Sequence, residues 1–310
     1  MPEESRIETL TRDHIDELTW LAGRALDHDD LPAPLLRRRI FADPDHDDSY
    51  SLGIWSGGHL ASAMIGVVRK REQEGKQVLA GYVRLFATSP EHRRKGYSSA
   101  LLAELERRFA EAGAASVSVG TEAPIWLTAG IDVRYTAALC FVQRRGYDRV
   151  RDTQNLAVDL AAQSFDTREV EAALAPKGYA FHRMEESARP ALDRYLSTRW
   201  WPAWRYEGLC ALDASPATGH IALKDGEIVG FAVYDIARPG WFGPTGTNEE
   251  LRGQGIGTVL LHRCYHDWQL QGRKVGEIAW IGPMYFYSIA SDARVCRFIL
   301  QFRKELVAGG

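Results

Sequence analysis

The chain has 310 residues and a formal net charge of −3, and 45% of its residues are hydrophobic. This length accommodates two ordinary domains, and the composition is typical of a globular protein with a buried core. The small negative charge argues against a broad nucleic-acid-binding surface and against attraction to an anionic membrane.

The first residues, the apolar runs and the cysteines all favour a cytoplasmic location. The first residues, MPEESRIETL, are acidic and contain no positive stretch followed by an apolar run, so we expect no secretory signal. The longest apolar runs, such as residues 61–68, are too short to cross a bilayer. The cysteines are scattered without a close pair, at Cys140, Cys210, Cys264 and Cys296. This spacing favours a reducing compartment, and we expect a cytoplasmic protein with no membrane partner.

Hydrophobic periodicity and turn residues predict alternating strands and helices along the first half. The predicted strands are at 7–10, 49–55, 59–71, 78–90 and 116–120, with a last one after residue 146. The predicted helices are at 12–25, 35–41, after residue 96 and near 135–145. Pro90 ends the long strand, because proline cannot donate a ladder hydrogen bond.

The second half repeats much of this order. Strands are predicted at 179–184, at 220–236 as a hairpin around Asp225–Gly226, at 241–247 and at 275–281. Gly96 and Gly255, which begin corresponding helices, lie 159 residues apart, close to half the chain. The sequence therefore predicts one architecture used twice, with domains at 1–160 and 177–310 and a linker at 161–176.

Each half contains a glycine-containing phrase between a strand and a helix, RRKGYS at 93–98 and RGQGIG at 252–257. The first N–H groups of a helix lack intrahelical partners, and the helix dipole adds positive charge there. Glycine lets a ligand approach this backbone closely, so the phrase predicts a phosphate site. It is neither a P-loop, which needs Gly-Lys-Ser/Thr, nor the Gly-x-Gly-x-x-Gly of dinucleotide folds. A turn that binds nothing is the alternative.

The pattern Arg-x-x-Gly-x-Gly resembles the phosphate loop of the GNAT superfamily of acyl-CoA-dependent acyltransferases, in its tandem form. The resemblance implies an α/β (α+β) fold of two GNAT-like domains, each a twisted, mostly antiparallel mixed sheet flanked by helices. It also implies that backbone amides of the loop hold the coenzyme A pyrophosphate. The second half matches throughout, at Arg252, Gly253, Gln254, Gly255, Ile256 and Gly257. The first half has Arg93, Arg94, Lys95, Gly96, Tyr97 and Ser98, where Ser98 adds a side chain and Lys95 adds charge.

The resemblance further implies an N-acyltransferase that uses acetyl-CoA as co-substrate, with a primary amine of a small molecule or peptide as acceptor and no metal. Acyl transfer requires the amine to lose a proton, the thioester oxygen to be stabilised and the thiolate to be protonated. An alkylamine has a pKa of ~10, so a base or a water chain assists at neutral pH.

In the family a tyrosine of the last conserved helix often protonates the thiolate. The first half, YTAALCFVQRRGY, has Val142 at that tyrosine position and Tyr135 at the preceding asparagine position, so Tyr135 is a possible substitute. In the second half Tyr287 is the candidate general acid, with Tyr285 as its competitor. An aromatic residue belonging to the core is the alternative for Tyr287.

Carboxylates near the ends of the central strands are the candidate bases. Glu122 follows the strand SVSVG, and Glu277 lies in VGEIAW on the same face as Val275 and Ala279. A solvated acid at a strand end is the alternative for both. The second half, with its complete loop and Tyr287, is the better catalytic candidate. The opposite assignment stays open, because the first half keeps the fuller last-helix phrase.

Two segments bear on the acceptor. Acidic runs at 27–30 and 43–48 would attract a cationic acceptor, unless they are solvated loops. WWPAWRY, from Trp200, would stack on a flat or sugar-like substrate, unless it belongs to the core or to a domain interface. His262 and His266 share a helix face, but Arg263 stands where a zinc protease needs glutamate, so no metal is expected.

Two rival functions share this fold. One is a non-catalytic acyl-CoA-binding protein that has lost its chemistry. The other takes an aminoacyl group from tRNA, which would require a basic surface that the net charge of −3 does not favour. We therefore expect no nucleic-acid partner.

Overall fold

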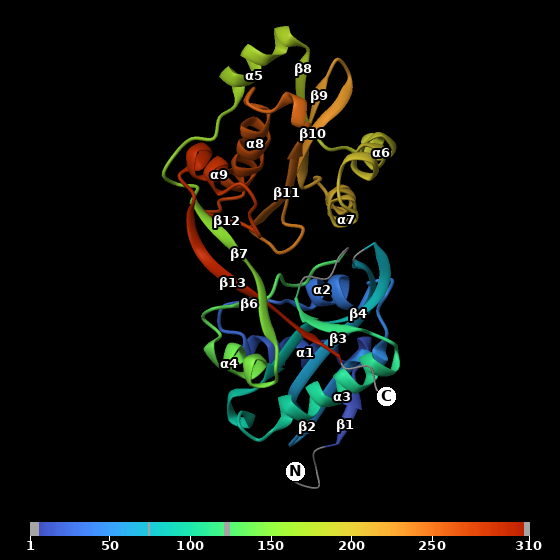
Figure 1. Cartoon of the computed structure of the whole chain (residues 1–310). Coiled ribbons are helices and arrows are strands. Elements are labelled where there is room, and N and C mark those ends of the chain that lie inside the picture. Colours follow the sequence, from blue (N-terminus) through green and yellow to red (C-terminus); the bar gives the residue numbers. More distant parts are fainter. Residues whose placement is uncertain (1–5, 74, 121–124, 307–310) are drawn as a thin grey trace. The chain divides into compact units, whose positions relative to one another are not determined.

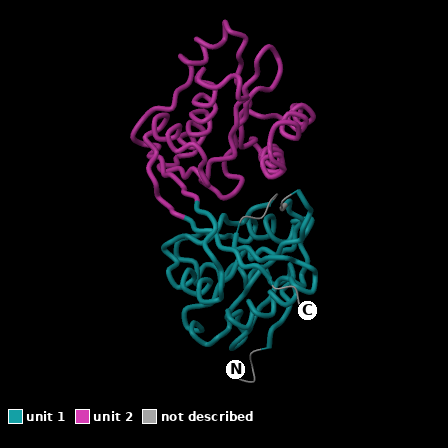
Figure 2. Tube along the Cα trace, in the orientation of Figure 1, with its two compact units in different colours: residues 1–152, 299–310 teal, residues 153–298 magenta. Residues whose placement is uncertain are grey.

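The structure is a computed structural model that describes residues 6–73, 75–120 and 125–306 (Figure 1). It divides into two compact units, coloured separately in Figure 2. Unit 1 comprises residues 1–152 and 299–310, and unit 2 comprises residues 153–298. Each contains a mixed, largely antiparallel sheet flanked by helices, which confirms the predicted fold class. No helix in these described ranges combines the length and the apolarity needed to span a membrane.

The sheet of unit 1 has the strand order β1-β2-β3-β4-β5-β13, with β6 also beside β13. Its strands are β1 (Ile7–Thr9), β2 (Ser51–Ser56), β3 (His59–Gln73), β4 (Lys76–Thr88), β5 (Ser116–Val119), β6 (Ile131–Asp132) and part of β13 (Arg294–Glu305). β4 and β5 are parallel, whereas β3 and β4 are antiparallel. Between the pairs Gly66–Val83 and Ile65–Leu85 the register shifts, so Arg84 is a bulge in the long central strand.

The helices of unit 1 pack on both faces of this sheet because neighbouring strand residues face opposite sides. They are α1 (Ile15–Ala25), α2 (Ala33–Leu36) continued by a π turn (Arg37–Phe41), α3 (Tyr97–Glu111) and α4 (Thr136–Arg144). On β3, Ile65 joins the core with α1 and α2, whereas Met64 joins the core with α3. Phe109 of α3 lies flat on β4 at Gly81, where a Cβ atom would be 2.3 Å from the ring. Glycine is needed there for close packing.

The sheet of unit 2 has the strand order β7-β12-β11-β10-β9-β8. The strands are β7 (Asp148–Asp159), β8 (Tyr179–Arg183), β9 (Gly219–Lys224), β10 (Glu227–Tyr234), β11 (Trp241–Thr247) and β12 (Val275–Ile278). The helices are α5 (Arg168–Leu174), α6 (Arg189–Arg199), α7 (Pro202–Cys210), α8 (Ile256–Leu270) and α9 (Met284–Ser291). α8 and α9 cover one face, and α6 and α7 the other (Figure 1). β11 and β12 are parallel, as β4 and β5 are in unit 1.

The last strand of the chain, β13, completes the first unit. Phe302 pairs with Val119 of β5 and is buried in the core that α3 covers. In turn, residues 156–159 of β7 pair with β12 in unit 2. The domain limits predicted from the sequence, 1–160 and 177–310 with a linker at 161–176, stay a prediction. In the structure that linker carries α5 and places Phe165 and Leu174 in the core of unit 2.

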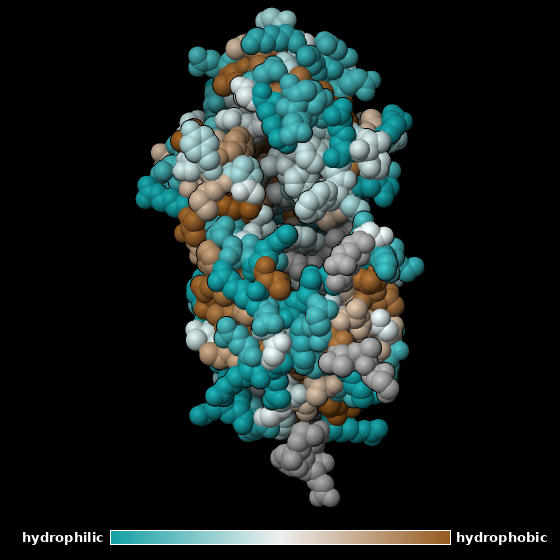
Figure 3. Space-filling model, in the orientation of Figure 1, coloured by the Kyte–Doolittle hydropathy of each residue, from teal (hydrophilic) through white to brown (hydrophobic). Residues whose placement is uncertain are grey.

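Hydrophobic side chains gather in these cores, with separate clusters on the two faces of each sheet. The face of the molecule drawn in Figure 3 is correspondingly covered mainly by hydrophilic residues, with hydrophobic ones scattered among them. Burial of apolar area at about 25 cal/mol per Å² is the main stabilising term. The cores hold the strand ends and helix starts on which the candidate site depends.

Candidate active site

The two glycine-containing loops have the same backbone conformation. In unit 2, Gly253 and Gly255 have left-handed φ angles of 78° and 89°, and Gly255 caps the N-terminus of α8. In unit 1, Arg94 and Gly96 have φ angles of 64° and 87°, and Gly96 caps α3. A left-handed non-glycine residue costs roughly 1–2 kcal/mol, so Arg94 is held there against its own preference. A short 3-10 turn precedes each loop, at Pro90–His92 and at Glu249–Leu251.

Both loops leave space beside their left-handed glycines. Among the described residues, none lies within 4 Å of a Cβ atom built on Gly96 or Gly253, and Val170 is 3.8 Å from one on Gly255. At Gly257 the neighbours are tighter, with the Phe286 ring at 3.5 Å and Thr247 Oγ1 at 3.6 Å. Open space next to a helix N-terminus is what binding of a phosphate requires, because the first N–H groups of a helix lack intrahelical partners.

Ser98, which stands in unit 1 where unit 2 has Gly257, turns its hydroxyl toward the sheet. Its Oγ lies 2.7 Å from Thr88 Oγ1, which in turn lies 2.7 Å from Ser62 Oγ. The extra hydroxyl is thus bonded inside unit 1. Arg145 donates a hydrogen bond to Ser99 Oγ in the first turn of α3. This guanidinium adds positive charge at the helix start, where Lys95 is also exposed.

The other loop residues have contacts within their own units, and their predicted role in coenzyme binding stays a prediction. Arg93 donates to the carbonyls of Thr88, at 3.4 Å, and Ala25, at 3.3 Å. Tyr97 and Ile256 are buried core residues at the first positions of α3 and α8. In unit 2, Gln254 accepts a 2.9 Å hydrogen bond from the Tyr179 hydroxyl, and Arg252 forms a 2.9 Å ion pair with Glu249.

In both units the pairing of the parallel strands ends at the same level, and this end of the pairing is called the parting. The last β4–β5 pair is Val83–Val119, and the Gly120 N–H donates to Val83 O at 3.1 Å. In unit 2 the last β11–β12 pair is Phe242–Ile278, and the Ala279 N–H donates to Phe242 O at 3.2 Å. In each unit the phosphate loop follows one strand of this parallel pair, β4 in unit 1 and β11 in unit 2.

Tyr287 of α9 lies next to the end of the β11–β12 pairing in unit 2. Its side chain is 7% exposed and packs against Phe242 and Phe286, with ring centroids 6.3 and 5.0 Å away. Burial raises the pKa of the Tyr287 hydroxyl above its usual value, so it stays protonated at neutral pH, as a proton donor must. Tyr285 is 80% exposed, on another side of α9. In unit 1, Val142 is the buried residue of α4 at the family's tyrosine position.

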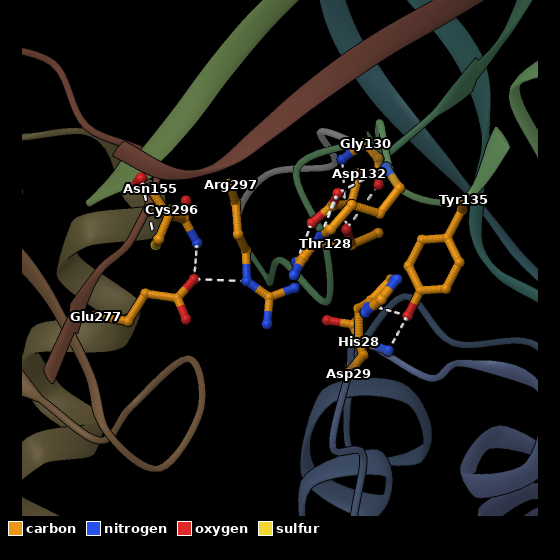
Figure 4. A network of polar contacts seen from close by, with 11 residues as sticks. His28, Asp29, Thr128, Gly130, Asp132, Tyr135, Asn155, Glu277, Cys296 and Arg297 are labelled. Carbon is orange, nitrogen blue, oxygen red and sulfur yellow. Dashed lines mark hydrogen bonds and ion pairs between the residues drawn. The ribbon is translucent and has the colours of Figure 1, made fainter. Parts of the chain in front are cut away.

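Glu277 lies on the opposite face of the sheet of unit 2 from Tyr287. It pairs with Trp241 on β11, next to the pair Phe242–Ile278 whose side chains join the core around Tyr287. Its Oε1 accepts hydrogen bonds from Asn155 Nδ2 at 2.6 Å and from Arg297 Nε at 2.7 Å (Figure 4). Asn155 also accepts from the Trp280 N–H at 2.8 Å, so its carboxamide holds both Glu277 and the start of the following loop. Glu122, the other candidate base, lies outside the described residues.

Asn155 and Arg297 were not among the residues singled out from the sequence. Asn155 is fully buried in β7, next to the buried Leu156, and a lone asparagine directly before the apolar residues Leu156 and Val158 is the signal that could have found it. Arg297 comes from β13, a strand with no counterpart among the predicted elements. Phe286, beside Gly257, belongs to the expected last helix, but its contact with the phosphate loop depends on tertiary packing.

The segments that bear on the acceptor are largely structural. Asp43 is buried and forms ion pairs with Arg69 and with Arg84, the latter at 3.0 Å. Trp200 lies on β11 at Gly246, where a Cβ atom would be 2.5 Å from the indole, and stacks on Trp204 with centroids 4.9 Å apart. Trp201 is 67% exposed. The position of Trp200 therefore favours core packing over substrate stacking.

His262 also has a structural contact, since its Nε2 lies 2.7 Å from the carbonyl oxygen of Ala290. Across the described ranges, no three or more histidine, cysteine, aspartate or glutamate residues gather in a way that could hold a metal ion.

Comparison with known proteins identifies the family. Residues 6–131 match the model of an acetyltransferase (GNAT) domain, and residues 180–280 match the acetyltransferase (GNAT) family. No curated protein sequence matches the chain.

Several solved structures share the fold over nearly the whole chain. A GCN5-related glucosamine N-acetyltransferase region of a fungal multi-domain GH3 β-N-acetylglucosaminidase is 16% identical with a TM-score of 0.73 and covers 98% of this chain, which spans only 38% of that protein. A GCN5-related N-acetyltransferase from Sphaerobacter thermophilus is 19% identical, with a TM-score of 0.68 and coverage of 98% of this chain and 96% of its own. A tandem GNAT protein from the clavulanic acid biosynthesis pathway is 16% identical, with a TM-score of 0.68 and 99% coverage of both chains. The chain belongs to the GNAT acetyltransferase superfamily and carries two GNAT domains in tandem.

Proposed function

We propose that the protein is an N-acetyltransferase that moves an acetyl group from acetyl-CoA directly to a primary amine of a small molecule or peptide. The observation that carries this proposal is the shared conformation of the two loops, with two left-handed residues before a helix N-terminus in each unit. The space beside Gly253 and Gly96 suits a pyrophosphate bound by backbone N–H groups.

Unit 2 is the proposed catalytic unit. The acceptor nitrogen attacks the thioester carbonyl carbon, the carbon–sulfur bond breaks, the sulfur takes a proton and the amine gives one up. Tyr287 is the proposed donor to sulfur, because it lies on α9 against Phe242, where the pairing of β11 and β12 ends, and its hydroxyl carries a proton at neutral pH. Glu277, on the opposite face of the sheet, is the proposed acceptor of the amine proton through water, held in place by Asn155 and Arg297.

Unit 1 keeps the loop but lacks the tyrosine. Val142 has no proton to donate, so the usual acid is missing from α4. Just beyond Val83, Arg84 donates a 2.9 Å hydrogen bond to the Ile125 carbonyl, and Leu127 joins the core that α1 covers. We propose that unit 1 binds acyl-CoA without turning it over.

The test is calorimetric titration with acetyl-CoA, combined with detection of free coenzyme A thiol in the presence of an amine panel. The panel contains a polyamine, an aminoglycoside, a lysine peptide and glucosamine, the last because of the named activity of the fungal structure. Binding with thiol release and an acetylated product supports the proposal. Binding without turnover on any amine supports a non-catalytic acyl-CoA-binding protein instead, and activity abolished by removal of tRNA supports an aminoacyl transferase.

A further inference from the structure

In unit 1 a tyrosine joins two segments that are far apart in the sequence (Figure 4). The Tyr135 hydroxyl donates a 2.8 Å hydrogen bond to Asp29 Oδ2 and accepts a 3.0 Å hydrogen bond from the His28 N–H. The His28 and Tyr135 rings also lie together, with centroids 5.3 Å apart. Asp29 and His28 belong to the loop after α1, and Tyr135 caps the N-terminus of α4.

The two joined segments lie on opposite sides of the parting between β4 and β5. The end of α1 is tied to β4, because Arg93 donates to both the Ala25 and the Thr88 carbonyls. Tyr135 follows β6, whose Asp132 pairs with Ile299 of β13. Since Phe302 of β13 pairs with Val119, β6 continues the line of β5 along that strand. The bonds from Tyr135 therefore run from the β5 side to the β4 side.

We propose that Tyr135 is a gating residue that controls the entry of the acyl arm of acyl-CoA into unit 1. The proposal rests on the proposed function, in which the loop at 93–98 holds the coenzyme's pyrophosphate beside the end of β4. From there the pantetheine arm would extend to the parting, where the bonds from Tyr135 cross its path. Entry requires these bonds to break, and their return retains the arm.

The chemistry of the contact suits a reversible closure. Asp29, His28 and Tyr135 are each partly buried, so water can replace the bonds when they open. A hydrogen bond to a carboxylate is stronger than one between neutral groups, so the closed form is favoured without being permanent. The contact between the His28 and Tyr135 rings adds buried apolar area to the closed form.

The experiment measures acetyl-CoA association and dissociation by stopped-flow fluorescence in the full chain carrying Gly255→Glu, which removes binding at the loop of unit 2. Tyr135→Phe in this background is expected to raise both rate constants about tenfold, the effect of losing one charge-assisted hydrogen bond. Kd changes much less, because both rates rise. Asp29→Asn weakens the same bond from the other side and is expected to raise both rates by a smaller factor. The matched control is Tyr147→Phe, whose hydroxyl bonds Glu106 at 2.8 Å and which is expected to leave the rates unchanged.

Equal rates with and without Tyr135→Phe overturn the gate while coenzyme binding by unit 1 stands. Binding that appears only after Tyr135→Phe or Asp29→Asn supports a gate that is normally shut. Absence of binding in all these variants, with binding by unit 2 intact in Gly96→Glu, overturns the gate and restricts the proposed function to unit 2. Absence of binding in the unmodified chain as well overturns the proposed function itself.

Discussion

The helices α3 and α8 begin from loops of the same conformation, yet their surroundings differ. The outer side of α3 carries surface ion pairs, such as those of Arg107 with Glu104 and Glu111. The outer side of α8 is covered by residues 161–178, where Arg263 binds both carboxylate oxygens of Glu171 at 2.7 Å. The loop conformation therefore does not depend on α5, since it is the same in unit 1, in whose described part no such helix covers α3.

A second difference between the units concerns the residues proposed for catalysis, because the residues proposed for coenzyme binding are present in both. Both units have a phosphate loop and parted strands, but only α9 presents a buried tyrosine at the family's position, whereas α4 presents Val142. Val142 is buried in the core of unit 1, so this unit forms its core without a tyrosine hydroxyl at that position. Repetition of an architecture thus preserves the features that folding requires and leaves the catalytic ones free to change.

The largest expected effect is the loss of acetyl-CoA binding by one of the two loops, which makes the loops unequal. Gly255→Glu places a side chain and a negative charge at a left-handed position in the proposed phosphate site and should weaken acetyl-CoA binding by unit 2 at least ~1000-fold, about 4 kcal/mol. Gly96→Glu should do the same in unit 1 only. Calorimetric stoichiometry measures both, and each single variant is expected to lose one class of site. If Gly255→Glu binds as many acetyl-CoA molecules per chain as the unmodified protein, that loop does not bind the coenzyme.

The next effect tests which unit the last strand stabilises. Phe302 is 1% exposed in the core of unit 1, so Phe302→Ala should lower its free energy of unfolding by about 3–4 kcal/mol through lost burial and a cavity. Val295→Ala, at an exposed position of the same strand, is the control and should cost under about 0.5 kcal/mol. Urea unfolding followed by hydrogen exchange measures the loss. Exchange that rises first in unit 2 would contradict the structural assignment of β13.

The third effect concerns the chemistry of unit 2. Tyr287→Phe removes only a hydroxyl and should lower kcat about 100-fold, the lower range for loss of a general acid, with little change in the Kd for acetyl-CoA. Tyr285→Phe, which alters an exposed hydroxyl on the same helix, is the matched control. Unchanged turnover in Tyr287→Phe would leave its hydroxyl outside the mechanism and shift attention to Tyr285.

The sequence predicts more of the fold than of the site. Strands such as 78–90 and the stripe of Leu101, Leu105 and Phe109 show strong periodicity, because burial of one face dictates where apolar residues stand. The phosphate loops are also recognisable, because their glycines and arginines stand close together in the sequence. The pairing of β13 with β5 and the bond from Asn155 to Glu277 join residues more than 100 positions apart. Arg297 reaches Glu277 from β13, a strand that the sequence did not predict. No local pattern encodes such contacts, and a tyrosine in the core resembles a catalytic one until its neighbours are known.

The smallest effect distinguishes the units by their response to acid. His220 is buried in unit 2, where its Nε2 lies 2.7 Å from Asp267, and Arg183 and Tyr234 bind the same carboxylate. Burial lowers the pKa of His220 below its usual value, although Asp267 opposes the shift, and the positive charges of Arg183 and Arg263 act in the same direction as burial. Burial also lowers the pKa of His262 in this unit.

As the pH falls through 6.5, the unfolded chain therefore takes up protons before folded unit 2 does. The stability contributed by a neutral His220 is complete above that pH and declines toward the lower folded pKa, by at most about 1.4 kcal/mol per pH unit for each group. Urea midpoints of unit 2 at pH 7.5 and 5.5 measure this loss, with an expected decrease of about 1 kcal/mol. His220→Gln, which cannot titrate, should flatten the slope. A slope that stays as steep in His220→Gln would assign the acid response to His262 or to the carboxylates, because only the imidazole is removed by that substitution.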